Sequence, residues 1–278
     1  MMYSVVYAPF ALSVAVVVLS RLGVKRLPPR AATWAITIAS AALSLSTAGA
    51  LALLACWLPA RLPIVAAVGG WRPESVASLS PTPTWTAAVA LAALVWLGWR
   101  VVRESGRLRS EFAVVVAAHA ELARFAGGVV VVEDAVPSAH AVARTLRRRG
   151  RVVVTTGMLD LLDDEERAAV VAHEHSHLRH GHGAFVAAVQ LSSALNPLIA
   201  PMRQDLHFTL ERWADEEAAE VTHRAVVASA LAKVAIAIMD ITEGEVPPPA
   251  LLMSLHTYAI SDRVTALLDN PKPRPRLV

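Results

Sequence analysis

The sequence predicts a mainly α-helical membrane protein, with three N-terminal transmembrane helices followed by an α+β domain that contains a small sheet. The composition supports the membrane assignment. Of the 278 residues, 55% are hydrophobic, and the mean hydropathy of +0.48 is too high for an ordinary soluble protein. Three long uncharged stretches lie within the first hundred residues, and two short β-branched runs follow later in the chain.

The uncharged stretches cover residues 1–20, 31–60 and 75–99. Each is long enough for a helix to cross a hydrocarbon core, which takes about 20 apolar residues. A cleaved secretory signal is the alternative for the first stretch, but no basic residue precedes its apolar run. We therefore expect a three-span transmembrane region over residues 1–102.

Basic residues define the expected orientation in the plasma membrane. They follow the first and third stretches at Arg21, Lys25, Arg26, Arg30, Arg100, Arg103, Arg107 and Arg109. Since cytoplasmic loops carry an excess of Lys and Arg, we expect the N-terminus outside and the chain after the third span in the cytoplasm. This anchoring also accounts for the pI of about 9.4, so the lipid bilayer is an expected partner and nucleic acid is not.

The α+β domain is expected over residues 103–244, and residues 245–278 are expected to form a linker, a terminal helix and a basic tail. Strands are predicted at residues 129–132 and 152–156, where β-branched side chains dominate. The lone Cys56 cannot form an intrachain disulfide, so redox chemistry is not expected.

A helix is predicted from Asp164 to His180. Asp163 can cap its first turn, Glu166 occupies the capping-box position, and Gly181 directly follows its end. This helix carries the residues on which the functional prediction depends.

A metal site is predicted from the sequence His-Glu-His-Ser-His at residues 173–177. Residues four apart share one face of a helix, so His173 and His177 can together hold a zinc ion, with Glu174 beside them as general base. A hydrolytic zinc site takes three protein ligands and leaves one position open for water. The expected reaction is hydrolysis of a peptide bond by this water, which loses its proton to Glu174.

Glu211 is the expected third ligand. Asp215, one helical turn further on, is expected to accept the second ring N–H of a ligand histidine. A histidine-rich helix with accidental spacing is the alternative, but the capping acids and the downstream Glu-x-x-x-Asp pattern disfavour it.

The other histidines near the motif are not expected to bind the metal. They are His175, His180, His182, His207 and His223. His175 points away from the metal face, and His180 and His182 lie at the helix end, where capping or exposure to solvent is the expected role. Glu216 and Glu217 are expected on the helix surface.

Residues 183–202 are uncharged, yet a simple membrane crossing is not expected there. The nine residue steps from Met202 to Glu211 span about 30 Å only when the chain is fully extended, and an extended unpaired chain cannot cross lipid. We therefore expect a hydrophobic re-entrant or interfacial helix pair that bends near Asn196 and Pro197.

Two stretches resemble integral-membrane gluzincin peptidases, among which the BlaR/MecR-type antirepressor metallopeptidases fit best. Residues 151–178 are similar to the strand, Gly-x-Leu turn and zinc-motif helix of that type and of the HtpX-like group. Residues 195–216 are similar to the Asn-Pro segment and the ligand helix, with Ala214 where that type usually has Cys. The resemblance implies a gluzincin-type zinc peptidase domain.

Further residue roles are implied by this resemblance alone. Ala139 and His140 would lie on an edge strand that pairs with the substrate backbone. His256 would stabilise the oxyanion as a catalytic residue, and Arg263 would belong to a terminal helix as a substrate-binding or ion-pair residue.

The sequence as a whole predicts a membrane-embedded zinc endopeptidase whose active site faces the cytoplasm. Its expected partner is a protein substrate, a transcriptional repressor or another regulatory protein. One alternative is an HtpX-like protease for quality control of membrane proteins. Another is a non-catalytic zinc-binding adaptor, which Glu174 disfavours, because structural zinc sites are closed by a fourth ligand and need no base. The oligomeric state is left open.

Overall fold

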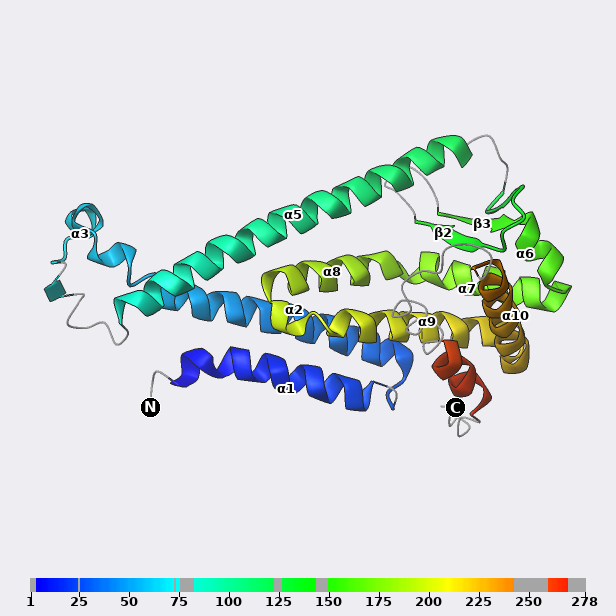
Figure 1. The fold of residues 1–278 in the computed structure, drawn as a ribbon, viewed down its shortest axis with the longest axis horizontal. Coiled ribbons are helices and arrows are strands. Elements are labelled where there is room, and N and C mark those ends of the chain that lie inside the picture. Colours follow the sequence, from blue (N-terminus) through cyan, green and yellow to red (C-terminus); the bar gives the residue numbers. More distant parts are fainter. Residues whose placement is uncertain are drawn as a thin grey trace, which may run out of the picture. The chain divides into compact units, whose positions relative to one another are not determined.

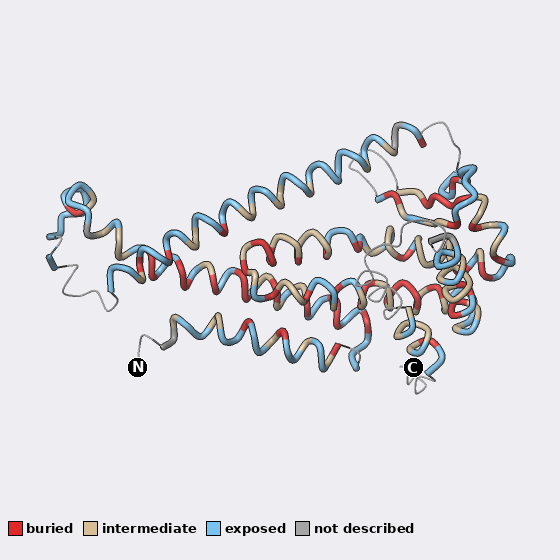
Figure 2. Tube along the Cα trace, viewed as in Figure 1, coloured by how far each residue is buried: buried red, intermediate tan, exposed pale blue. Residues whose placement is uncertain are grey.

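The computed structural model describes residues 4–24, 26–72, 74–75, 83–122, 127–143, 150–242 and 260–269 (Figure 1). Within these ranges the chain is mostly helical and contains one small mixed sheet. Figure 2 shows how far each described residue is buried.

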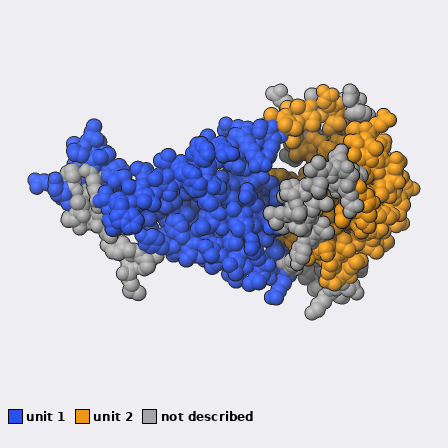
Figure 3. Space-filling view, viewed as in Figure 1, with its two compact units in different colours: residues 1–111, 184–207 blue, residues 112–183, 208–278 orange. Residues whose placement is uncertain are grey.

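Two compact units make up the fold (Figure 3). Residues 1–111 and 184–207 form the first, and residues 112–183 and 208–278 form the second. Residues 184–207 therefore fold with the N-terminal helices, although they follow part of the second unit in the sequence. The predicted domain boundaries at residues 102 and 244 stay predictions.

The first unit is helical. Its elements are the 3-10 turn Ser4–Tyr7, α1 (Ala8–Gly23), α2 (Pro29–Ala55), the turn Pro59–Arg61, α3 (Pro63–Gly69), most of α5 (Thr84–Leu122), α8 (His182–Leu195), the turn Pro197–Ile199 and the start of α9 (Met202–Val221). In the described part of the chain, α2 and α5 are long and apolar enough to cross a membrane. Because α1 has only 16 residues, fewer than the about 20 that a crossing takes, the three predicted spans are not confirmed.

Helix α5 is one continuous element of 39 residues. The sequence predicted a span over the uncharged residues 75–99, but the helix continues to Leu122, and neither Gly98 nor Gly106 interrupts it. In an apolar 18-residue segment of α5 only 17% is buried, whereas 44% is buried in the corresponding segment of α2. Helix α2 therefore packs inside the helical unit, whereas α5 leaves most of its apolar surface exposed (Figure 2).

Asn196 links three segments of the first unit. This buried side chain donates from Nδ2 to Ser13 Oγ at 3.0 Å and to Thr47 Oγ1 at 3.1 Å. Such bonds satisfy polar groups that would otherwise be costly in apolar surroundings. Asn196 also ends α8, so the predicted bend is present at this point. The relation of this helix pair to a membrane stays a prediction.

The second unit contains a three-stranded sheet of order β1-β3-β2. Strand β3 (Arg151–Thr155) lies in the centre, parallel to β1 (Val129–Val132) and antiparallel to β2 (Ala139–Val142). Both strands predicted from composition are confirmed. The edge strand β2 was expected from the resemblance alone.

Side chains of the central strand pack on both faces of the sheet. Val152 and Val154 join a cluster with α6 (Thr156–Leu161) and with side chains of α7 (Asp164–His180) and α10 (Arg224–Thr242). On the other face, Val153 packs with Leu122 at the end of α5. The sheet therefore holds α7 firmly against one side.

Helix α7 has the bounds that the sequence predicted, and its capping box is confirmed. Asp163 Oδ1 accepts from the Glu166 backbone N–H at 2.9 Å, and Glu166 Oε2 accepts from the Asp163 N–H at 3.1 Å. The buried Glu166 also accepts hydrogen bonds from Ser229 and Lys233, both at 2.7 Å. These bonds tie α10 to the first turn of α7, and Ala230 and Val234 of α10 pack in the same cluster as the central strand.

Gly157 is expected to be indispensable for stability, because its backbone approaches a neighbouring loop closely. Its N–H donates to Asp134 O at 2.8 Å, and a Cβ added at Gly157 would lie 2.1 Å from Ala135 O. We expect Gly157→Ala to lower the free energy of unfolding by about 1–3 kcal/mol. Thermal unfolding of the purified protein measures this. Gly183→Ala is the matched control, since a Cβ there meets open space, and an equal loss in both variants would contradict the steric argument.

Candidate metal centre

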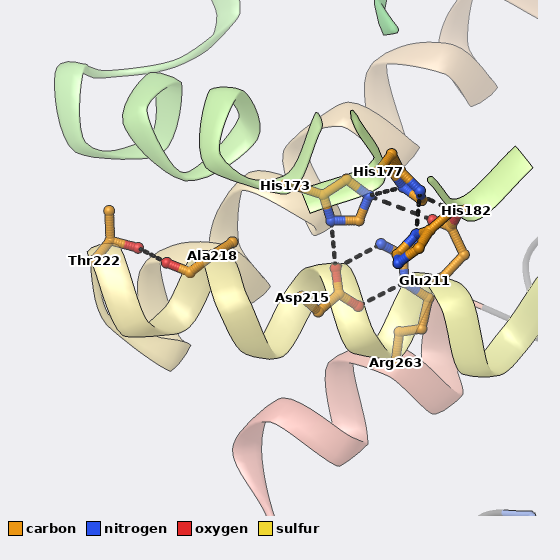
Figure 4. A network of polar contacts seen from close by, with 8 residues as sticks. All are labelled: His173, His177, His182, Glu211, Asp215, Ala218, Thr222 and Arg263. Carbon is orange, nitrogen blue, oxygen red and sulfur yellow. Dashed lines mark hydrogen bonds and ion pairs between the residues drawn. The ribbon is translucent and has the colours of Figure 1, made fainter. Parts of the chain in front are cut away.

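The structure brings the three predicted ligands together. His173 and His177 lie one turn apart on α7, and their Nε2 atoms are 3.1 Å apart. Helix α9 places Glu211 opposite them, with Oε2 at 3.5 Å from His173 Nε2 and Oε1 at 3.5 Å from His177 Nε2 (Figure 4). One ligand atom from each residue lies within 4.8 Å of the other two.

The donor set and its spacing fit zinc. Two imidazole nitrogens and one carboxylate oxygen are ligands of catalytic zinc sites. Ligand atoms about 2.1 Å from a tetrahedral zinc ion are separated from one another by about 3.4 Å. The observed separations of 3.1 and 3.5 Å lie on either side of this value.

Asp215 lies beside His173, at the position that the predicted support of this candidate ligand requires. Its Oδ1 lies 3.0 Å from His173 Nδ1, and the carboxylate is buried. Arg263, on a helix of residues 260–268, binds Asp215 through Nε at 2.8 Å and Nη2 at 2.7 Å. Its Nη1 lies 3.0 Å from Glu211 Oε2. Arg263 therefore bridges the two carboxylates of the site, which matches the ion-pair role considered for it.

The charges of these groups perturb one another strongly. Burial alone would lower the pKa of His173, but hydrogen bonds to Asp215 and Glu211 raise it to about 9. Burial would raise the pKa of both carboxyls, but their contacts with Arg263 and His173 hold each pKa well below its usual range. Burial, reinforced by the charge of His173, lowers the pKa of His177 to about 4. Two carboxylates therefore stay ionised beside the imidazole pair.

Glu174 lines a cavity of about 210 Å³ beside the same groups. Burial raises the pKa of its carboxyl to about 7, with His173 opposing the shift and Glu211 adding to it. A general base works best when its pKa is close to the operating pH. The position and the pKa of Glu174 both suit the predicted role.

Strand β2 borders this cavity. Ala139 lines it, and the backbone of Ala141 forms a hydrogen bond with the Glu174 carboxyl. The side chain of His140 is exposed and is not part of the cavity lining. The pairing of β2 with a substrate stays a prediction. His256 lies outside the described residues.

The expectation for His182 was wrong, because this residue is neither exposed nor a helix cap. It is buried, and its Nδ1 lies 2.7 Å from His177 Nδ1. Burial lowers the pKa of His182 to about 3, with the charges of His177 and His180 adding to the shift. The signal for this contact is Gly181, which ends α7 with a φ of 61° and lets the chain turn back toward His177.

The remaining acids and histidines have simpler positions. Glu217 was expected on the surface, but its Oε1 lies 2.6 Å from His180 Nε2 and accepts from Trp213 Nε1 at 3.2 Å. His175 is exposed as expected, with Nδ1 at 2.8 Å from Val171 O. The two other histidines excluded as ligands, His207 and His223, are also exposed.

Comparison with known proteins supports a peptidase. Residues 103–204 match the family model of Peptidase family M48. Similar relatives include a protease HtpX homolog of Methanothermobacter thermautotrophicus, 52% identical over 64 residues, which are 22% of this chain and 24% of that protein. Protease HtpX homologs of Acidiphilium cryptum and a Sulfurovum species are each 44% identical, over 52 and 50 residues. These two matches cover 19% and 18% of this chain and 18% of either relative.

These matches cover less than a quarter of the length of each relative. No solved structure matches the chain. Over the matched segment, the predicted resemblance to HtpX-like membrane metallopeptidases is confirmed. A BlaR/MecR-type specificity is not shown.

Proposed function

We propose that this chain is a zinc endopeptidase anchored in the plasma membrane by several helices. The observation that carries the proposal is the convergence of His173, His177 and Glu211, with Glu174 beside them in a cavity. The match to Peptidase family M48 over residues 103–204 supports the same reaction class.

The residues of the site have separate tasks in this reaction. His173, His177 and Glu211 would hold zinc, which when bound supplies a Lewis acid for hydrolysis of the peptide bond. Glu174 accepts the proton of the attacking water and passes it to the leaving amine. Asp215 keeps the Nδ1 proton of His173 engaged, so that the Nε2 lone pair of this ring faces the metal.

The substrate that we propose is a membrane protein or a protein close to the membrane, cut on the cytoplasmic side. Similarity to three protease HtpX homologs favours quality control of several substrates. The alternative is a single regulatory substrate such as a transcriptional repressor, which the BlaR/MecR-like ligand helix at residues 195–216 favours. The proposed orientation, with the N-terminus outside, rests on the arginines that follow the apolar stretches.

Removal of the metal should abolish cleavage reversibly. We expect the purified protein in lipid nanodiscs to contain about one zinc ion per chain, because a catalytic site of this ligand set holds a single ion. A chelator should stop cleavage of an unfolded protein substrate, and stoichiometric zinc should restore it. The metal content is measured by atomic emission and the cleavage by electrophoresis. Full activity in the chelated protein would contradict the proposed mechanism.

The number of stabilised proteins separates the two substrate classes. Membrane and cytosolic proteomes are compared between cells that carry the wild type and cells that carry Glu174→Gln. Accumulation of many membrane proteins supports quality control, and accumulation of one regulator supports the repressor-like alternative. Cells with the exposed Glu165→Gln substitution on the same helix are the matched control.

A further inference from the structure

His182 contacts the ligand His177 on the ring edge that faces away from the metal centre. The two Nδ1 atoms are 2.7 Å apart, whereas His177 Nε2 lies 3.1 Å from His173 Nε2 and 3.5 Å from Glu211 (Figure 4). His182 therefore does not compete for the metal.

The metal ligation that we propose fixes the direction of this hydrogen bond. A ligand imidazole presents an unprotonated nitrogen to the cation, so neutral His177 carries its proton on Nδ1. This N–H then donates to His182 Nδ1, and His182 carries its own proton on Nε2. Among the described residues, the buried His182 Nε2 has no hydrogen-bond partner.

An unpartnered donor in the protein interior costs free energy of folding. Because the Nε2 proton of His182 makes no hydrogen bond to any described residue of this site, the hydrogen-bonding role of the ring rests on its Nδ1 acceptor.

Packing holds the His182 ring in place. Its centroid lies 5.0 Å from that of Trp213 and 6.0 Å from that of His180, which is stacked on it. Glu217 in turn binds both neighbours, through Trp213 Nε1 at 3.2 Å and His180 Nε2 at 2.6 Å. The acceptor is thus held by rings that are themselves fixed, as a support for a metal ligand requires.

We propose that His182 is a positioning residue that accepts the Nδ1 proton of His177 and thereby directs the Nε2 lone pair of this ligand toward zinc. The proposal rests on the proposed zinc peptidase function. His182 acts on His177 as Asp215 acts on His173. Because the imidazole acceptor is uncharged, it adds no negative charge to a site that already contains Glu211 and Asp215.

Two amide substitutions distinguish this role from mere filling of space. His182→Asn places an amide oxygen near the position of Nδ1, whereas His182→Gln places its amide near the position of Nε2. The zinc affinity of the full chain in nanodiscs is measured by competition with a chelator. We expect His182→Gln to raise the zinc Kd about 10- to 100-fold and His182→Asn to stay within about threefold of the wild type.

The absorption spectrum of the cobalt-substituted protein gives a second readout at the metal. We expect the spectrum of His182→Asn to match the wild type and that of His182→Gln to be shifted. His175→Gln, at an exposed histidine of α7, the helix that carries His177, is the matched control and should change neither readout.

Equal zinc affinities in the Asn and Gln variants would overturn the proposal. Loss of folding in both variants, measured by thermal unfolding in chelator, would also overturn it, because His182 would then be a structural residue. If the wild type itself binds no zinc, the proposed peptidase function fails. Zinc binding by the wild type that is insensitive to His182 defeats only the present inference.

Discussion

Glu174→Gln should lower the rate of peptide-bond cleavage by a factor of about 10²–10⁴ and leave zinc binding intact. The amide has nearly the shape of the carboxylate but cannot accept the proton of the attacking water. Glu174 is not among the three residues that converge as ligands, so the metal content should stay at the wild-type level. Single-turnover cleavage of an unfolded protein substrate measures the rate, and atomic emission measures the zinc.

Glu165→Gln is the matched control for this variant, because Glu165 is exposed on the same helix and lies outside the cavity lining. It should cleave at the wild-type rate. Undiminished turnover in Glu174→Gln would remove the general-base role and leave the site without its proposed mechanism. Loss of zinc together with activity would instead make Glu174 part of the metal coordination.

Arg263→Met should lower the free energy of unfolding of the metal-free protein by about 3–5 kcal/mol, because the buried carboxylate of Asp215 loses both bonds to the guanidinium. The side chain of Asp215 is only 3% exposed, and Arg263 contacts both of its oxygens as well as Glu211. Arg263→Lys should lose less, since it keeps the charge but not the planar fork that binds two oxygens. Chemical denaturation in the presence of a chelator measures the difference.

A second substitution tests the cause of this loss. Adding Asp215→Asn to Arg263→Met removes the unpaired charge, so the double variant should be more stable than Arg263→Met alone. Arg179→Met, at an exposed arginine of α7, is the matched control and should be near neutral. A loss in Arg263→Met no larger than in this control would show that the ion pairs do not stabilise the fold.

Local signals made α7 and the ligand set predictable from the sequence. The ends of α7 are marked by Asp163, Glu166 and Gly181, whose effects act within a few residues. The spacing of the two ligand histidines follows from the helical repeat. Glu211 and Asp215 were found in the same way, because a separation of four residues places both on one face of α9.

The contact of His182 was missed, and Arg263 and strand β2 were expected from the resemblance alone. His182 lies five residues after His177, beyond the helix end, and only the left-handed turn at Gly181 brings the two rings together. The contact of Arg263 with Asp215 joins residues 48 positions apart. Strand β2 has the sequence Ala-His-Ala-Val with a single β-branched residue, so its composition carries little signal, whereas β1 consists of four valines.

The long helices were misjudged for a different reason. Arginines after Trp99 indicated the end of the apolar span, but α5 continues through them and through Gly106, because a single glycine weakens a helix without ending it. Conversely, the uncharged first stretch yields only the 16 residues of α1. Absence of charge measures compatibility with lipid and does not by itself set the length of a helix.

Helix α9 alone carries Glu211, Trp213 and Asp215, which are respectively a ligand, the ring packed on His182 and the acceptor for His173. A rotation of α9 by one residue, about 100°, would withdraw all three side chains together. All three contacts therefore depend on the orientation of one helix. A rotation of α9 would affect zinc retention and the alignment of both imidazoles at the same time.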